Sequence, residues 1–202
     1  FYLFDEVNEY SIPKKIVCLT DKDPVRKNKV KDRNFKTCYP YEFNSDNETY
    51  EYDLNNVVHA SSNILIFKQD SIHGKTLEYE LAYLNPSLKI LVTQSTKNTS
   101  ELYGLMDSYN DPDSTVQQLI DKLRSSEENT RIKIGINSSN LTDDEKKRSI
   151  IASRYLNSVS KGENALELAV ALQKNLLNKG SDAYVEVVIP TYIQEALEVL
   201  CQ

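Results

Sequence analysis

The sequence lacks any apolar run approaching the roughly 20 residues that a membrane-spanning helix requires, and no signal-peptide pattern opens it. These absences predict a chain with no membrane partner, located in the cytoplasm. Cysteine and histidine are scarce, with 3 and 2 copies, and none has the spacing of a zinc site. Cys18, Cys38 and Cys201 are therefore predicted to be reduced, buried structural thiols, and His59 and His73 to be loop residues.

Excess positive charge is also missing, because the formal net charge is −6. This argues against a protein that holds nucleic acid by bulk electrostatics alone, although a nuclease active site can concentrate carboxylates. The chain opens with Phe1 and has no initiator Met, so we expect it to be part of a longer polypeptide. Its 202 residues can form one domain with a substantial core, either alone or with a second, small subdomain.

Alternating strand and helix patterns predict an α/β fold, with a mostly parallel sheet flanked by helices. The apolar, β-branched segment 16–20 predicts a parallel strand buried on both faces. Further strands are expected at 63–67, 88–92 and 184–189. Helices are predicted by helical apolar spacing or capping signals at 77–84 after Thr76, 116–123, 143–160 after the capping box Thr142–Glu145, 163–179, and 191–200 after Pro190.

The first candidate site follows segment 16–20. Asp21 and Asp23 stand at the carboxyl end of a predicted core strand, where α/β sheets bind ligands. Paired carboxylate oxygens suit Mg²⁺ or Mn²⁺, although an ordinary Asp-rich turn has the same pattern. A polar, basic excursion at 25–56 could contact phosphates or be a solvated loop. Its cations and the aromatic residues proposed to stack on bases are Arg26, Lys27, Lys29, Lys31, Arg33 and Lys36, with Tyr39, Tyr41 and Phe43.

Two further segments carry charged candidates. Glu78 and Glu80 lie in a predicted first helical turn, where negative charge complements the helix dipole. Residues two apart do not share a helix face, so both would bind one metal ion only if the helix began later. Lys161 and Glu163 flank Gly162 between two predicted helices. The lysine could neutralise developing phosphate charge, or the segment could be a simple helix–helix joint broken at Gly162.

The order of the segments is more specific than any one of them. It runs Asp21-Lys22-Asp23-Pro24, Lys75-Thr76-Leu77-Glu78-Tyr79-Glu80, Lys161-Gly162-Glu163-Asn164 and Ile189-Pro190-Thr191-Tyr192. Together these resemble the C-terminal Toprim region of OLD-family (overcoming lysogenization defect) nucleases, which include the nuclease subunit of Gabija-type antiphage systems. The resemblance implies that residues 1–202 are a Toprim nuclease domain with a helical insertion at about 97–160. It also implies DNA nicking or cleavage by two Mg²⁺ or Mn²⁺ ions.

Residue by residue, the resemblance implies that Asp21 and Asp23 bind metal. Glu78 is the next ligand and Glu80 a lesser candidate. It also implies that Lys161 stabilises the transition state of an in-line attack on a DNA phosphate, assisted by Glu163.

Two family features are missing from the sequence. One is an upstream Glu-Gly turn that supplies a metal ligand, and the other is the upstream ATPase domain through which ATP would act. We therefore expect this chain alone to be inactive. The implied partners are DNA, the ATPase domain, further copies of the parent protein and a helicase-like protein. Two alternatives stay open: a Toprim domain of a primase or topoisomerase, and a non-catalytic docking module.

Overall fold

The structure is a computed structural model that describes residues 15–24, 26–29, 35–42, 49–51, 64–69 and 74–201. Contacts divide the chain into two compact units. The strand unit contains Phe1–Pro40, Asp46–Thr76 and Ile189–Gln202, and the helical unit contains Tyr41–Ser45 and Leu77–Val188. Helices and a small parallel sheet are both present, so the predicted α/β class is confirmed. Each unit is described on its own below.

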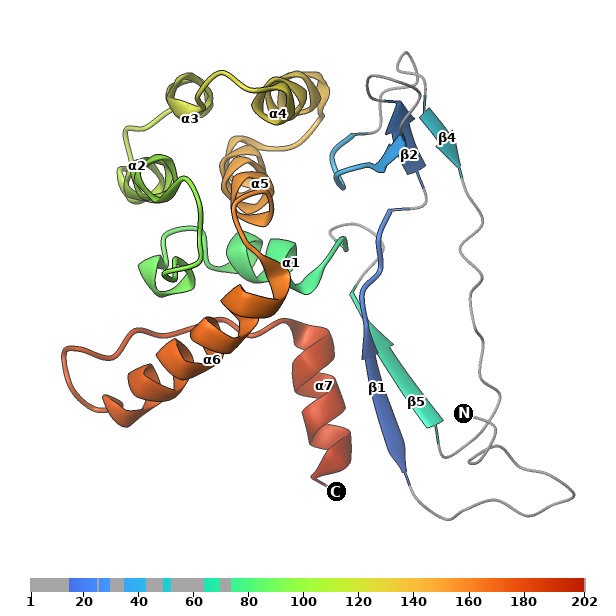
Figure 1. The fold of residues 1–202 in the computed structure, drawn as a ribbon, viewed down its shortest axis with the longest axis vertical. Coiled ribbons are helices and arrows are strands. Elements are labelled where there is room, and N and C mark those ends of the chain that lie inside the picture. The colour runs from blue at the N-terminus through green and yellow to red at the C-terminus, as the bar shows by residue number, and fades with distance from the viewer. Residues whose placement is uncertain are drawn as a thin grey trace, which may run out of the picture. The chain divides into compact units, whose positions relative to one another are not determined.

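In the strand unit, β1 (Ile16–Thr20) pairs in parallel with β5 (Ile64–Lys68), with Ile16 opposite Ile64. Helix α7 (Thr191–Leu200) follows Pro190 and packs against both strands (Figure 1). The predicted parallel pairing and C-terminal helix are confirmed. The predicted burial of both strand faces is wrong, because the β1 side chains are only half-buried or exposed. The β-branched residues form the strand, but the described part of this unit does not cover it on both sides.

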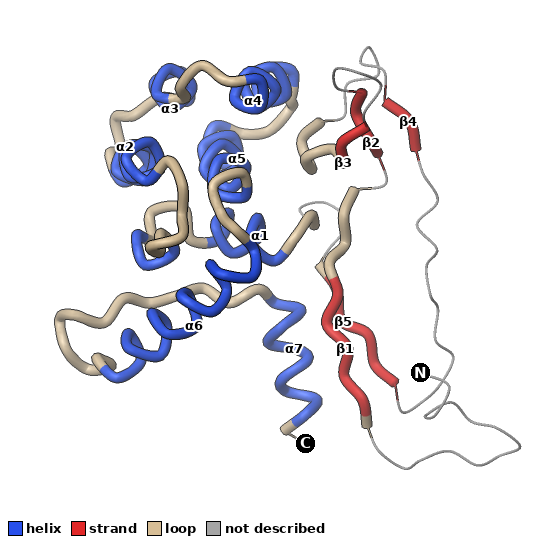
Figure 2. The backbone as a smooth tube through the Cα atoms, viewed as in Figure 1, coloured by secondary structure: helices blue, strands red, loops and turns tan. Residues whose placement is uncertain are grey.

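The excursion at 25–56 contains a small antiparallel sheet in the order β3-β2-β4 (Figure 2). Its strands are β2 (Arg26–Lys29), β3 (Phe35–Thr37) and β4 (Thr49–Glu51). These strands are short and mostly polar, so the apolar pattern of the sequence did not predict them. Tyr39 and Tyr41, after β3, are buried, so the prediction that they stack on bases is wrong. Lys31, Arg33 and Phe43 lie outside the described residues.

The helical unit is built around one central helix, α5 (Asp143–Leu156), which contacts the helices numbered before it (Figure 1). Every residue from Ser149 to Tyr155 is buried, as expected of a helix enclosed by its neighbours. The surrounding elements are α1 (Leu77–Leu84), η2 (Lys89–Leu91), α2 (Thr99–Asn110), α3 (Val116–Lys122), α4 (Glu127–Ser138) and α6 (Lys161–Leu177).

Local signals fixed several helix boundaries correctly. The capping box before α5 is present: the Thr142 backbone N–H donates to Glu145 at 2.8 Å, and Glu145 N–H donates to the Thr142 hydroxyl at 3.4 Å. Helix α1 begins directly after Thr76, as predicted. Two boundaries were wrong. Helix α5 ends at Leu156 rather than near 160, and α6 begins at Lys161, so Gly162 lies inside a helical turn.

Both predicted strands in the helical unit are wrong. Segment 88–92 contains η2, closed by the bond from Val92 N–H to the Lys89 carbonyl. Segment 184–189 is not a strand, because asparagine amides take the place of a ladder partner. Asn175 bonds both backbone groups of Val185 at 2.7 and 2.9 Å, and Asn85 bonds both of Val188 at 2.9 and 2.8 Å.

The predicted apolar faces of two helices also need correction. In α1, Tyr79, Leu81 and Ala82 are buried, whereas Leu77 is exposed. In α6, the predicted stripe is exposed or only half-buried: Ala165, Leu168, Ala169, Leu172 and Leu176. The residues that α6 buries are the polar Asn164 and Asn175. Side-chain amides, rather than an apolar stripe, hold this helix to its unit.

Two glycines in the helical unit give opposite expectations for substitution by alanine. A Cβ at Gly135 in α4 would lie 2.7 Å from Cε2 of Tyr41, a buried ring whose hydroxyl contacts Ser153 at 2.8 Å. Gly135→Ala should therefore destabilise the protein by about 1–3 kcal/mol through overpacking. Nothing lies within 4 Å of a Cβ at Gly104 in α2, so Gly104→Ala should stabilise by about 0.5–1 kcal/mol. Urea unfolding of both variants checks the pair, and a stabilised Gly135→Ala would contradict the packing argument.

The three cysteines are free thiols. Cys38 is buried, Cys18 is half-buried and Cys201 is exposed, so the prediction of burial holds only for Cys38. His59 and His73 lie outside the described residues. None of the helices that the structure describes is both long enough and apolar enough to span a membrane.

Candidate functional site

In the strand unit, a polar turn follows the parallel strands at their carboxyl ends. Asp21 is exposed and comes directly after β1, while Gln69 is buried and comes directly after β5. The Gln69 carboxamide oxygen accepts a hydrogen bond from Lys22 N–H at 2.8 Å, and its Nε2 lies 3.4 Å from Asp21 Oδ1. Because Gln69 is 2% exposed, its amide holds the Asp21–Asp23 turn against the end of β5.

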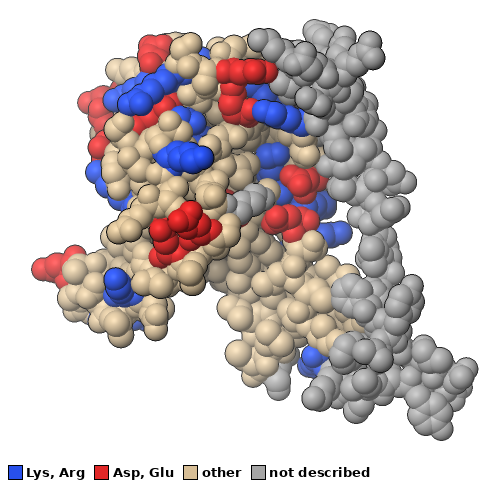
Figure 3. All heavy atoms as spheres, viewed as in Figure 1, with Lys and Arg blue, Asp and Glu red and all other residues tan. Residues whose placement is uncertain are grey.

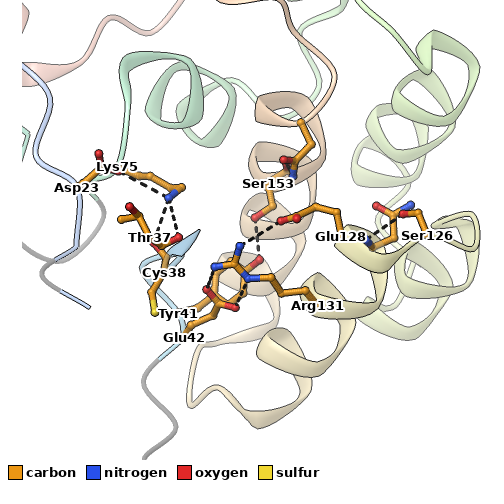
Figure 4. A network of polar contacts seen from close by, with 12 residues as sticks. Asp23, Thr37, Cys38, Tyr41, Glu42, Lys75, Ser126, Glu128, Arg131 and Ser153 are labelled. Atoms are coloured by element: carbon orange, nitrogen blue, oxygen red, sulfur yellow. Dashed lines mark hydrogen bonds and ion pairs between the residues drawn. The ribbon is translucent and has the colours of Figure 1, made fainter. Parts of the chain in front are cut away.

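Lys75 is the second buried polar residue at this turn (Figure 4). Its ammonium donates to the carbonyls of Thr37 at 3.2 Å and Cys38 at 3.1 Å. It lies 3.6 Å from Asp23 Oδ1 and 5.1 Å from the centre of the Tyr39 ring. A protein cation therefore already balances one of the two carboxylates, and it ties the turn after β1 to the segment after β3.

Sequence analysis assigned no role to Gln69 or Lys75. For Gln69 a signal was available: like Asp21, it is the first polar residue after a strand whose neighbour is parallel. Polar residues at such ends converge on one edge of the sheet. For Lys75 no signal existed, because the sequence does not separate a buried lysine from a solvated one.

In the helical unit, Glu78 and Glu80 both lie in the first turn of α1. The turn is regular helix from Leu77 onward, so the two carboxylates point in different directions. Both carboxylates could bind one ion only if α1 began later in the chain, and it begins at Leu77. Both glutamates are half-buried, and Oε2 of Glu80 is a buried atom. Burial raises the pKa of Tyr155 to about 12, and the charge of Glu78 contributes to this rise.

Tyr155 of the central helix contacts the segment that contains Asn164. Its ring is fully buried in α5, and its hydroxyl lies 3.0 Å from the Leu91 carbonyl and 3.1 Å from Asn164 Oδ1. Asn164 belongs to the Lys161-Gly162-Glu163-Asn164 segment. Thus the lysine turn of α6 and the segment around Leu91, far apart in sequence, both contact one tyrosine of the central helix.

Lys161 is the first residue of α6, and Glu163 is exposed in the same turn. The side chain of Lys161 lies outside the described part of the structure. The predicted candidates are therefore distributed over both units. Asp21 and Asp23 lie in the turn after β1 in the strand unit, and the turns that carry Glu78 and Lys161 lie in the helical unit.

Among the described residues, no three carboxylate, histidine or cysteine side chains lie close enough together to hold a metal ion. Acidic and basic side chains are intermingled on the face of the helical unit seen in Figure 3. The chain matches no family model, no curated protein and no solved structure. The functional argument therefore depends on the site chemistry and on the resemblance stated above.

Proposed function

We propose that the chain is the Toprim-type part of a divalent-metal-dependent DNA endonuclease of the OLD kind. The observation that carries the proposal is the Asp21–Asp23 turn, which follows β1 at the carboxyl end of a parallel strand pair. Ligands of open α/β sheets bind at this edge. The buried amide of Gln69 accepts a hydrogen bond from the backbone of this turn. Asp21 itself is exposed to solvent.

The donor chemistry at this turn fits Mg²⁺ or Mn²⁺, which prefer carboxylate oxygens. Asp21 and Asp23 would hold the ion, and the described carboxylates fall short of a complete set of ligands. The proposal therefore requires at least one more acidic ligand, in keeping with the Glu-Gly turn of the family that this sequence lacks. A bound cation would orient the phosphate and offset the charge on the departing oxygen.

The protein's own residues have separate roles in this proposal. Lys75 limits repulsion between the carboxylates by pairing with Asp23. Lys161, at the start of α6, would contact an equatorial oxygen of the reacting phosphate and neutralise the charge that develops there. Glu163, exposed in the same turn, would orient Lys161 or the attacking water. Glu78 is the preferred ligand of the α1 pair, and Glu80 the lesser one.

One observation favours the second candidate function, a non-catalytic docking module. The Lys75 ammonium lies 3.6 Å from Asp23, so a protein cation could replace the metal ion permanently. In that case the carboxylates would have a structural role, and the full-length protein would neither bind divalent metal at this turn nor cut DNA. Metal binding therefore separates the two candidates.

The test is plasmid nicking by the full-length protein with Mn²⁺ or Mg²⁺, with and without ATP. Asp21→Asn should lower the nicking rate by on the order of a hundredfold or more, since it removes a charged ligand while keeping the shape of the side chain. Asp182→Asn is the matched control, because Asp182 is an exposed aspartate in the turn after α6. Its nicking rate should equal that of the wild type.

Three results would each decide something different. Nicking that depends on metal and on Asp21 supports the endonuclease. Absence of nicking together with absence of Mn²⁺ binding supports the docking module. Relaxation of supercoils without lasting nicks, or incorporation of nucleotides, supports a topoisomerase or primase instead.

A further inference from the structure

We infer that Asn164 and Tyr155 are positioning residues that fix the lysine turn of α6 against α5 and the loop after η2. The inference rests on the proposed endonuclease function, and it deepens that function by naming what sets the geometry of Lys161. The observation behind it is a buried, directional hydrogen-bond network that joins α5, α6 and the loop after η2. All of its members belong to the helical unit.

Asn164 is at the centre of the network. It is 1% exposed, although the four α6 residues that flank it, Gly162, Glu163, Ala165 and Leu166, are all exposed. Its Nδ2 donates to the Thr93 hydroxyl at 2.8 Å and to the Thr96 hydroxyl at 3.3 Å, and its Oδ1 faces the Tyr155 hydroxyl at 3.1 Å. The amide bonds at both of its ends within a cluster of hydroxyl groups, so it attaches the first turn of α6 to α5 and to the loop after η2 at once.

The loop that receives Asn164 is itself held firmly. Thr93 N–H donates to the Thr96 hydroxyl at 3.0 Å, and Lys97 N–H donates to the Ser158 carbonyl at 2.7 Å. One turn further along α6, Glu167 accepts from both the backbone and the hydroxyl of Ser95 at 2.9 and 2.8 Å. The first two turns of α6 are therefore attached to the loop at 93–97 by polar contacts.

Apolar packing does not replace this attachment. Among its described side chains, helix α6 fully buries only Asn164 and Asn175, while Leu168, Ala171 and Leu172 on the same face are half-buried, so the two amides are the main groups that fix its rotation about its own axis. Such a rotation would move the Cα of Lys161, three residues before Asn164 and on the same side of the helix. Positions at which charge must be neutralised in a transition state tolerate little displacement: a shift of about 1 Å can cost on the order of a hundredfold in rate.

The helix supplies its own control. Asn175 resembles Asn164 in residue type and burial, and it also bonds at both ends of its amide, to the backbone of Val185 at 2.7 and 2.9 Å. It stands in the last turn of α6, remote from Lys161. Removing either amide should lower stability by a similar amount, but only Asn164 should control the lysine turn.

The experiment compares Asn164→Leu with Asn175→Leu in the full-length protein, using steady-state plasmid nicking and thermal unfolding. We expect kcat to fall by on the order of tenfold to a hundredfold in Asn164→Leu, with KM for DNA unchanged, and to stay near wild type in Asn175→Leu. Equal kcat in the two variants would overturn the inference, whether both are active or both are impaired.

A milder pair covers the case in which Asn164→Leu fails to fold. Thr93→Val removes the hydroxyl that accepts at 2.8 Å, and Thr93→Ser retains it. Loss of kcat in the valine variant with recovery in the serine variant supports the inference, and unchanged kcat in both overturns it. A wild-type protein that does not nick DNA at all would refute the proposed function itself, which separates that failure from failure of the positioning role.

Discussion

Glu101→Ala is expected to lower the free energy of unfolding by about 3–5 kcal/mol, because it leaves a buried cation without its partner. Glu101 in α2 is 5% exposed, and its Oε2 accepts from Arg154 of α5 at 2.8 Å. Its other oxygen accepts from Arg124 N–H at 3.1 Å and from the Asn129 amide at 3.0 Å. One carboxylate thus accepts hydrogen bonds from three parts of the helical unit. The substitution removes all of these hydrogen bonds together.

The same group makes stability depend on pH in a defined direction. Burial alone would raise the pKa of Glu101, but the hydrogen bonds and charge of Arg154, with those from Arg124 and Asn129, outweigh it and lower the pKa below its ordinary 4.5. A lowered folded-state pKa contributes stability that is complete above the ordinary value and is lost as the pH falls through the folded-state value. The stability difference between wild type and Glu101→Gln should therefore shrink below pH 4.5.

An exposed ion pair in the same unit is the control. Lys89 and Asp107 are 2.7 Å apart, but their side chains are 54% and 58% exposed. Asp107→Ala should cost no more than about 1 kcal/mol, since solvent screens exposed pairs. Urea unfolding at neutral pH measures both variants. Equal losses in the two would show that burial does not govern the energetics of these pairs.

Lys161→Ala is expected to reduce metal-dependent nicking by on the order of a hundredfold or more, because it removes the cation that would stabilise charge in the transition state. Stability and Mn²⁺ binding should stay close to those of the wild type, since Lys161 opens an exposed helical turn. Steady-state nicking rates, combined with thermal unfolding and Mn²⁺ titration, test all three parts of this expectation.

Lys174→Ala is the matched variant for this comparison. Lys174 lies in the last turn of the same helix and is exposed, so its removal changes the net charge equally without touching the lysine turn. It should nick DNA at the wild-type rate. If both lysine variants lose activity equally, the effect comes from general attraction of DNA, and the specific role of Lys161 is wrong.

Much of the fold was accessible from sequence where the signal is local. The apolar run Ile16–Thr20, the capping box Thr142–Glu145 and Pro190 before α7 each act within a few residues. Segment 184–189 has the apolar, β-branched composition of a strand. Its backbone groups nevertheless bond to the side chains of Asn85 and Asn175 instead of to a neighbouring strand. Such distant amide partners leave no periodicity in the segment that they bind.

The candidate site shows the same division. Asp21, Asp23, Glu78 and Lys161 could be named because a strand end or a helix start marks each of them. Lys75 and Tyr155 could not be assigned roles from local pattern, because their importance comes from burial beside a residue far away in the chain. Burial of a polar side chain depends on the complete fold.

The contrast between α5 and α6 has a consequence for the motions of the helical unit. Opening α5 would expose a continuous buried segment, Ser149 to Tyr155, so it requires loss of nearly the whole core. Among its described side chains, helix α6 fully buries only Asn164 and Asn175, and it can separate locally at lower free energy. The hydrogen bonds of Asn164 to Tyr155, Thr93 and Thr96 then keep the lysine turn ordered. While these bonds are formed, the rest of α6 can fluctuate without disturbing the core.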